Sequence, residues 1–371
     1  MNDRIKAAFF AIALTFAFGP ASAQIYVGQT AGFTGPVAAG VKETSDGAQL
    51  YIDKINGSGG INGQKIEIVA MDDKFNPKLT AETTRTLVED KHVVAMFLSR
   101  GTPNTEAMIP VLNKDSVPLI GPSTGAMSLH EPLQRYVFNV RSTYQKEAER
   151  AVIHLTTVGL QRIAVVHADD SFGRDALAGA TKGFEIARLK PVDVIKADRS
   201  KPDFPPIVKR ILDSNAQAVL WFGSGNAVAD GIKLLRAKGS AARVVTLSNN
   251  ASAGFVKSLG KDARGVIVSQ VFPSERSIAN PFVGEADKLA KEKGRVLSPA
   301  MLEGFAAAKV LVEGLRRAGP KPTREKLQAA LEQIKDFNLG GGLKLSYSAE
   351  NHTGLNFVDL SIVTDDGHFL R

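Results

Sequence analysis

The sequence contains no cysteine. This absence excludes disulfide bonds, thiolate chemistry and an N-terminal cysteine that could carry a lipid anchor. No apolar run comparable to Ala7–Phe18 follows it, so the mature protein is expected to be soluble. Lysine and arginine do not gather with aromatic residues, which argues against nucleic-acid binding. No phosphate-loop motif is present, so neither an ATP site nor another cofactor is expected.

The first residues have the three parts of a secretory signal. Arg4 and Lys6 give a basic start, Ala7–Phe18 is apolar but too short to span a bilayer, and Ala21-Ser22-Ala23 offers small residues at a cleavage site. We therefore expect residues 1–23 to be a cleaved signal peptide, with the mature chain released into the periplasm. A buried N-terminal helix is the alternative interpretation of the same pattern.

The remaining chain predicts two α/β units. Its length favours about two domains, because a single hydrophobic core stops growing near roughly 250–300 residues. Short apolar segments alternate with helical stretches from Ile25 to Ile120 and again from Glu147 to Leu247. This alternation predicts two parallel sheets, each covered by helices on both faces. Three more helical stretches and two closing strands are predicted at 280–293, 299–318, 323–333, 343–347 and 355–363.

Polar loops follow the predicted strands, at the edge where open parallel sheets bind ligands. They are rich in glycine, serine, threonine and asparagine and lie at 31–36, 99–104, 121–125, 167–172, 223–226 and 248–250. Their hydroxyls, amides and backbone N–H groups suit hydrogen bonding of a small polar ligand rather than acid–base chemistry at neutral pH. We therefore expect a binding protein and not an enzyme.

Thr102 and Pro103 predict the start of a helix at one of these loops, with Thr102 as the N-cap and Pro103 at the first helical position. The free N–H groups and the positive end of the helix dipole would suit a carboxylate there. Capping without any ligand explains the pair as well. The net charge of +8 also has two interpretations, because it favours an anionic ligand but also increases solubility.

Three motifs suggest sharper chemistry that the sequence does not sustain. Gly223-Ser224-Gly225 resembles a dinucleotide-binding turn, but Val228 replaces the third glycine and Ser248 replaces the acid that would hold a ribose. The segment 167–171 contains one histidine and two aspartates, which match no metal-ligand spacing and cannot form a triad from adjacent positions. Asp72-Asp73 could be a pair of acids that act together, but Asn76-Pro77 follows, so a turn and a helix start explain the segment better.

Short segments spread over nearly the whole mature chain resemble the periplasmic binding proteins of branched-chain amino acid ABC importers, the leucine/isoleucine/valine-binding family. They are Phe33-Thr34-Gly35-Pro36, Ile55-Asn56, Gly59-Gly60-Ile61-Asn62-Gly63, Asp72-Asp73, Val117–Pro122, Phe172-Gly173 and Gly265. Each motif is weak alone, but their order and spacing are specific. The resemblance implies a type I periplasmic binding fold, with two doubly wound parallel-sheet lobes joined by three chain crossings.

The same resemblance implies how the chain is divided and how it works. Lobe 1 would comprise residues 24–144 and 273–350, and lobe 2 would comprise residues 145–272 and 351–371. The lobes would close on a ligand by hinging near Tyr144, Phe272 and Glu350, and a membrane permease would then receive it from a monomeric binding protein. A ligand sensor with the same fold remains an alternative that the sequence does not separate from transport.

The family's ligand residues transfer to this sequence unevenly. The serine that meets the ligand carboxylate falls on Thr102, and the aromatic residue that closes over the ligand falls on Phe172. A small polar loop that clasps the amino and carboxylate groups falls on Ser123, Thr124 and Gly125. The resemblance therefore implies a preserved set of carboxylate contacts.

Other positions depart from the family. Gly40 stands where the family often has an aromatic residue, and Gly225 and Asn226 replace aromatic residues in the second lobe. These replacements leave room for a larger ligand. The acid that pairs with the ligand's ammonium group falls near Ser248. A buried ammonium without a charged partner is costly, by several kcal/mol.

Unless Asp169, Asp170 or another acid moves in, an α-amino acid is therefore not the expected ligand. The expected ligand is a small carboxylate, of the branched-chain amino acid class or a related aromatic acid or amide. Our hypothesis is that its remainder is larger or less cationic than leucine. The predicted ligand-binding residues are Arg100, Thr102, Ser123, Thr124, Gly125, Phe172, Asn226 and Ser248.

Overall fold

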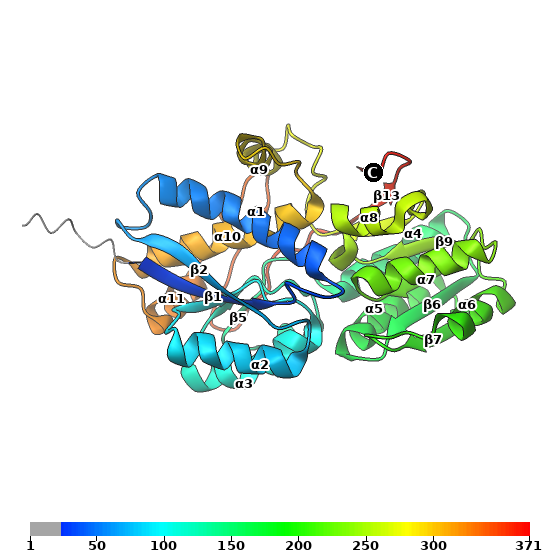
Figure 1. Ribbon diagram of the computed structural model, residues 1–371, viewed down its shortest axis with the longest axis horizontal. Helices are drawn as coiled ribbons and strands as arrows, with labels where there is room; N and C mark the ends of the chain where they lie inside the picture. Colours follow the sequence, from blue (N-terminus) through cyan, green and yellow to red (C-terminus); the bar gives the residue numbers. More distant parts are fainter. Residues whose placement is uncertain (1–23) are drawn as a thin grey trace, which may run out of the picture.

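The computed structural model describes residues 24–371, so the predicted signal peptide lies outside the described range. Two separate α/β units lie side by side (Figure 1), and each is built around its own sheet. The predicted fold class is confirmed. Within residues 24–371, no helix is both long and apolar enough to cross a membrane.

The first sheet defines what we call lobe 1. Its strands are ordered β2-β1-β3-β4-β5 and all pair in parallel. Their bounds are β1 Gln24–Ala31, β2 Lys65–Asp72, β3 Ala95–Phe97, β4 Leu119–Ile120 and β5 Val137–Phe138. The covering helices are α1 Ala38–Gly57, α2 Pro77–Arg85, α3 Thr102–Asp115, α9 Pro281–Glu292, α10 Pro299–Ala318 and α11 Arg324–Glu332. Adjacent side chains of β3 alternate between faces, so Phe97 joins the cluster under α1 and α10 while Met96 joins the cluster under α3.

The second sheet defines lobe 2. Its strands are ordered β14-β13-β10-β9-β8-β6-β7. Their bounds are β6 Ile163–Ala168, β7 Asp193–Ala197, β8 Ala218–Phe222, β9 Arg243–Thr246, β10 Ile267–Gln270, β13 Asp359–Val363 and β14 Phe369–Leu370. The helices are α4 Tyr144–Thr157, α5 Ser171–Ala187, α6 Phe204–Asp213, α7 Gly225–Ala237 and α8 Ala253–Leu259. Here Val165 packs under α4 and α5, and Val166 packs toward α6 and α7.

The last strands depart from the parallel arrangement that the sequence predicted. β13 runs antiparallel to β10, with Asp359 opposite Gln270, and β14 runs antiparallel to β13. The chain leaves lobe 2 after the carboxyl end of β10 and re-enters beside that same end. It therefore runs in the opposite direction along β10, because a parallel pairing would need a crossover back to the other end.

The chain crosses between the lobes after β5, after β10 and before β13. As a result, the late helices α10 and α11 lie in the same lobe as the early helix α1, while β13 lies with lobe 2 (Figure 1). The predicted strand at 343–347 is shorter than expected. It pairs as β12 Lys344–Leu345 with β11 Phe337–Asn338 in a separate hairpin and does not join the lobe 1 sheet.

Helices α1 and α10 pack with their backbones in contact, which depends on two glycines. A Cβ atom added at Gly47 would lie 1.9 Å from the main-chain oxygen of Met301. A Cβ added at Gly304 would lie 1.8 Å from the main-chain oxygen of Thr44. Neither contact can be relieved by a side-chain rotation, so the close approach of these helices requires glycine at both positions.

We expect Gly47→Ala to lower the free energy of unfolding by about 2–3 kcal/mol, because the two helices must separate to admit the methyl group. Urea denaturation measures this change. Gly57→Ala is the matched control in the same helix, since nothing lies within 4 Å of its would-be Cβ. That substitution should leave stability within about 0.5 kcal/mol of wild type or raise it slightly. Equal effects of the two substitutions would contradict the proposed packing.

Candidate ligand-binding site

The strand-end loops of the two sheets face each other and enclose two adjoining pockets. Lobe 1 contributes the loops after β1, β2 and β3, and lobe 2 contributes the loops after β6, β7, β8 and β9. Arg100 and Asn249 line both pockets, so they separate one from the other. The first pocket includes Thr102, Tyr144 and Phe172, and the second is lined largely by small residues.

Arg100 lies at the centre of this cleft and contacts both lobes. Its guanidinium donates to the Ser123 hydroxyl of lobe 1 at 2.8 Å and to the main-chain oxygen of Asn249 of lobe 2 at 2.5 Å. The residue is only 6% exposed, and within residues 24–371 it forms no ion pair. A Cβ at Gly40 would lie 3.5 Å from Nη2 of Arg100. The space predicted beside this glycine is therefore partly occupied by the guanidinium.

Thr102 begins α3 as predicted, but it does not cap the helix. Gly101 occupies the capping position, and the Thr102 hydroxyl is instead hydrogen-bonded to the Thr124 hydroxyl at 2.7 Å. Gly101 has a φ of 89°, and a Cβ there would meet the Phe75 ring at 2.6 Å. A glycine is thus needed for the turn that aims the N-terminus of α3 at the first pocket.

The other predicted residues divide into those at the pockets and those behind them. Phe172 lines the first pocket and meets the Tyr144 ring edge to face, with centroids 4.9 Å apart. Asn226 lines the second pocket. Gly125 packs against the backbone that leads into α4, where its carbonyl accepts from the Tyr144 N–H at 2.8 Å. Ser248 lines neither pocket and belongs to a buried ionic network at the hinge.

That network centres on an ion pair that the sequence did not reveal. Arg141, on the first crossing between lobes, pairs with Glu147 in the first turn of α4, and their side chains are 2% and 0% exposed. Arg141 also donates to the Ser248 hydroxyl at 2.7 Å. Glu147 accepts from the Ser248 N–H at 2.9 Å and from the hydroxyl of Ser269 in β10. Burial is the largest influence on Arg141 and opposes its charge, but Glu147, Tyr144 and Glu303 together more than offset it, so the pKa of Arg141 lies above its ordinary value.

The sequence indicated that the family's ammonium-binding acid is missing near Ser248, but the structure places the carboxylate of Glu147 there. Its carboxylate is already neutralised by Arg141, so it is not available to a ligand's ammonium group. The two acids considered as replacements are engaged as well. Asp169 pairs with the exposed Lys196 at 3.3 Å, and Asp170 caps α5 through the Gly173 N–H at 2.9 Å.

Three further acids near the cleft connect the two lobes. Glu43 of α1 accepts from the N–H groups of Ala253 and Gly254 at the start of α8, at 3.0 and 2.7 Å. Glu106 of α3 accepts from the Ser171 hydroxyl of α5 at 2.6 Å. Asp175 accepts from the main-chain N–H of Met127 in lobe 1 at 3.2 Å and from Gln145 at 2.7 Å.

No catalytic or metal constellation accompanies these contacts. Within residues 24–371, no group of three histidines or acids could hold a metal ion. His167, which the sequence placed beside two aspartates, is buried in β6 and contacts its neighbour's carbonyl. Arg141, Glu147 and Arg199 are the site residues that sequence reasoning missed. No local motif marks them, because their partners come from other elements or from the other lobe.

Two α/β lobes joined by three crossings, with a polar cleft between their strand ends, define a two-lobed ligand-binding protein. The sequence model of the periplasmic binding protein family matches residues 24–367. The chain belongs to this family. Its members bind substrates rather than convert them, which confirms that the chain is not an enzyme.

Individual relatives and structures agree with this assignment. The chain is 26% identical over 352 residues to Leu/Ile/Val-binding protein homolog 3 of Brucella melitensis, covering 91% of each protein. It resembles the crystal structure of a substrate-binding periplasmic protein from Ralstonia solanacearum with a TM-score of 0.86 and 31% identity, covering 94% of this chain and 99% of that one. A branched-chain amino acid ABC transporter structure from Thermus thermophilus with bound valine shares the fold, with a TM-score of 0.83, 19% identity and 94% coverage of both chains.

The buried ion pair at the hinge predicts a large effect of removing one partner. Glu147→Gln should lower the free energy of unfolding by about 3–5 kcal/mol, because it leaves the Arg141 guanidinium buried without a counter-charge. Asp193→Asn is the control, since Asp193 pairs with the half-exposed Arg210 on the surface of lobe 2. Its cost should stay below about 1 kcal/mol. Urea denaturation measures the loss of stability in both variants, and similar losses would contradict the role given to the buried pair.

Asp175 predicts a specific dependence of stability on pH. Burial raises the pKa of Asp175 to about 6, above its ordinary value of about 3.9 in an unfolded chain. The folded protein therefore binds a proton that the unfolded chain releases, so lowering the pH from 7 to 5 should stabilise wild type by about 1 kcal/mol relative to Asp175→Asn. His130, whose pKa burial lowers to about 4, is present in both proteins and cancels. A difference that stays constant with pH would contradict the prediction.

Proposed function

We propose that this protein captures a small carboxylate in the periplasm and delivers it to the membrane permease of an ABC importer. The proposal includes removal of residues 1–23 as a signal peptide, closure of the two lobes on the ligand, and action as a monomer without nucleic acid. Relatives described as Leu/Ile/Val-binding proteins and the valine-bound transporter structure support a small ligand of this class.

We place the lobe boundaries at residues 24–144 with 273–350, and at 145–272 with 351–371. The apolar clusters support this division. One cluster joins Ile25 of β1 to Phe305 of α10, although residues 145–272 of lobe 2 lie between them in sequence. Another joins Phe369 of β14 to Trp221 of β8. The hinge would then lie in the three segments that connect the sheets.

The observation that carries the proposed ligand class is the unpaired guanidinium of Arg100. A buried charge is costly unless it is paired, and arginine matches a carboxylate with two parallel hydrogen bonds. The nearby Thr102, Ser123 and Thr124 add hydroxyls, and α3 adds the positive end of its dipole. We infer that the ligand's carboxylate binds here, with Gly125, Phe172, Asn226 and Ser248 completing or supporting the site.

The charges of the acids at the two pockets argue against an ammonium group on the ligand. Asp170 is the one carboxylate among the residues described as lining the two pockets, and it pairs with Arg199. Glu147 is neutralised by Arg141. A zwitterionic amino acid would therefore bring a cation without a partner, whereas a simple carboxylic acid would leave no charge unpaired.

Matched pairs of acids test this proposal by thermal shift and calorimetry. L-leucine should be compared with 4-methylpentanoate, which has the same carbon skeleton without the ammonium group, and valine with 3-methylbutanoate. Aromatic acids such as phenylacetate extend the series to larger ligands. We expect the unaminated acids to raise the melting temperature more than their amino acid counterparts. A strong response to leucine, isoleucine or valine alone would refute the ligand class.

Arg100→Gln should weaken the binding of any acid that binds by at least about tenfold, because a charged hydrogen bond is worth about 1.5–3 kcal/mol. Arg264→Gln is the matched control. Arg264 is exposed, pairs with Asp365 at 3.0 Å and lines neither pocket. Unchanged affinity in the Arg100 variant would show that the carboxylate binds elsewhere.

A further inference from the structure

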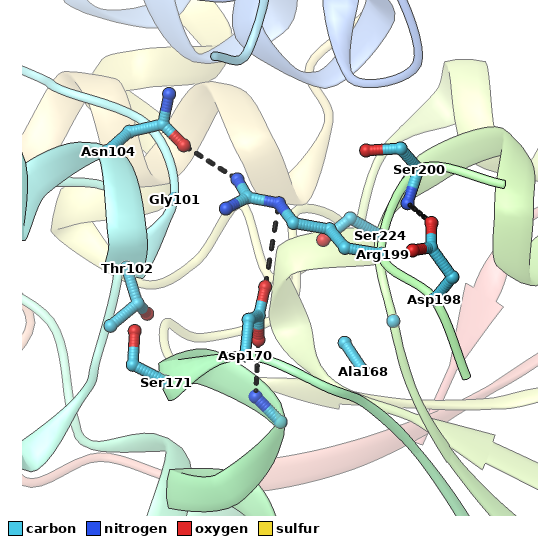
Figure 2. A network of polar contacts seen from close by, with 12 residues as sticks. Gly101, Thr102, Asn104, Ala168, Asp170, Ser171, Asp198, Arg199, Ser200 and Ser224 are labelled. Carbon is cyan, nitrogen blue, oxygen red and sulfur yellow. Dashed lines mark hydrogen bonds and ion pairs between the residues drawn. The ribbon is translucent and has the colours of Figure 1, made fainter. Parts of the chain in front are cut away.

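Arg199 extends from lobe 2 into lobe 1. It belongs to the loop after β7, and Figure 2 shows its guanidinium between Asn104 and Asp170. Nη2 donates to the side-chain oxygen of Asn104 in α3 at 2.6 Å, and Nε lies 3.5 Å from the carboxylate of Asp170 in its own lobe. The guanidinium carbon also lies 3.9 Å from the centre of the Phe75 ring. One side chain thus makes three contacts, and two of them cross the cleft.

The lobe 1 half of this arrangement is held in place by lobe 1 alone. The Asn104 amide donates to the Thr80 hydroxyl at 2.8 Å, which leaves its oxygen directed at Arg199. Phe75 is held by its main-chain N–H, which donates to Asp73 at 2.8 Å, and its ring packs against the small apolar cluster that includes Val37. Both partners are therefore in position whether or not lobe 2 is near.

The lobe 2 half is likewise self-contained. Asp198 accepts from the N–H groups of Ser200 and Lys201 at 2.7 and 2.6 Å, which fixes the loop that carries Arg199. Asp170 is fixed as the cap of α5. The contacts of Arg199 with Asn104 and Phe75 are thus the part of the arrangement that depends on the two lobes coming together.

We propose that Arg199 is a positioning residue that clasps the two lobes in the closed conformation and thereby retains the ligand. Arg199 lines the first pocket together with Arg100, Phe75 and Asp170, so its contacts with lobe 1 also form a wall of that pocket. A ligand in the pocket would be enclosed only while these contacts hold. The retention of a ligand rests on the proposed function, but the clasp between the lobes does not.

The absence of cysteine gives a clean background for measuring closure in the full mature chain. Cysteines replacing Lys78 on α2 and Lys209 on α6, both exposed, would carry donor and acceptor dyes on the two lobes. Single-molecule energy transfer then gives the ratio of closed to open molecules, first alone and then with saturating 4-methylpentanoate. Arg199→Gln should lower this ratio about tenfold, because it removes a charged hydrogen bond and a cation–π contact.

Two further variants separate the clasp from a general effect of charge or folding. Arg210→Gln removes one arginine from the same lobe, where it pairs with Asp193, and should leave the ratio unchanged. Phe75→Leu keeps an apolar side chain against Val37 but removes the aromatic face, and should lower the ratio by several-fold. In stopped-flow measurements, Arg199→Gln should raise the dissociation rate of the bound acid about tenfold with little change in its association rate.

The outcomes are distinguishable. A ratio unaffected by Arg199→Gln in both conditions would overturn the clasp, as would a wild-type protein with no closed molecules in either condition. An equal decrease in the Arg210→Gln variant would also overturn it. If the ratio falls without ligand but 4-methylpentanoate has no effect on wild type, the clasp stands and the proposed ligand class fails.

Discussion

The buried pair of Arg141 and Glu147 is the interaction on which the cleft depends. It ties the first crossing to α4, and through Ser248 and Ser269 it also holds the loop after β9 and the carboxyl end of β10, which leads to the second crossing. A carboxylate in this position would attract a cation if it were free. Because Arg141 neutralises it, the base of the cleft holds the hinge together without offering a negative charge to the ligand.

The other acids near the cleft follow the same division of roles. Glu43 connects α1 to the start of α8, and Glu106 connects α3 to the start of α5. Asp170 forms an ion pair with Arg199. These acids therefore hold the lobes and the hinge, while Arg100, which has no ion pair, lines both pockets. In the proposed function, electrostatic complementarity would favour an anion over a cation, since each unpaired buried charge carries a desolvation cost that only an opposite charge offsets.

The sequence predicted most of the fold because alternating apolar strands and periodic helices are local signals. It did not predict β5 or β14, which have two residues each, or the antiparallel direction of β13, which follows from where the chain re-enters lobe 2. In the site, Arg100 and Ser123 were predictable because each follows a strand of one sheet. The contacts of Arg141 and Arg199 were not predictable, because their partners become neighbours only when the chain crossings have folded and the two lobes are in contact.

The contact between the lobes is polar, and this limits how strongly it can hold. The large apolar clusters lie mostly within single lobes. The exceptions are Ala126 and Tyr144, which pack into lobe 2, and Val271, Phe272 and Leu355, which pack into lobe 1. Each polar contact across the cleft contributes only about 0.5–1.5 kcal/mol net, or somewhat more where a charge is involved. In the proposed closure, a few such contacts would keep the open and closed states close in free energy. Arg100 contacts Ser123 and Asn249 in different lobes, so the proposed ligand would shift the balance toward closure by contacting a residue that joins them.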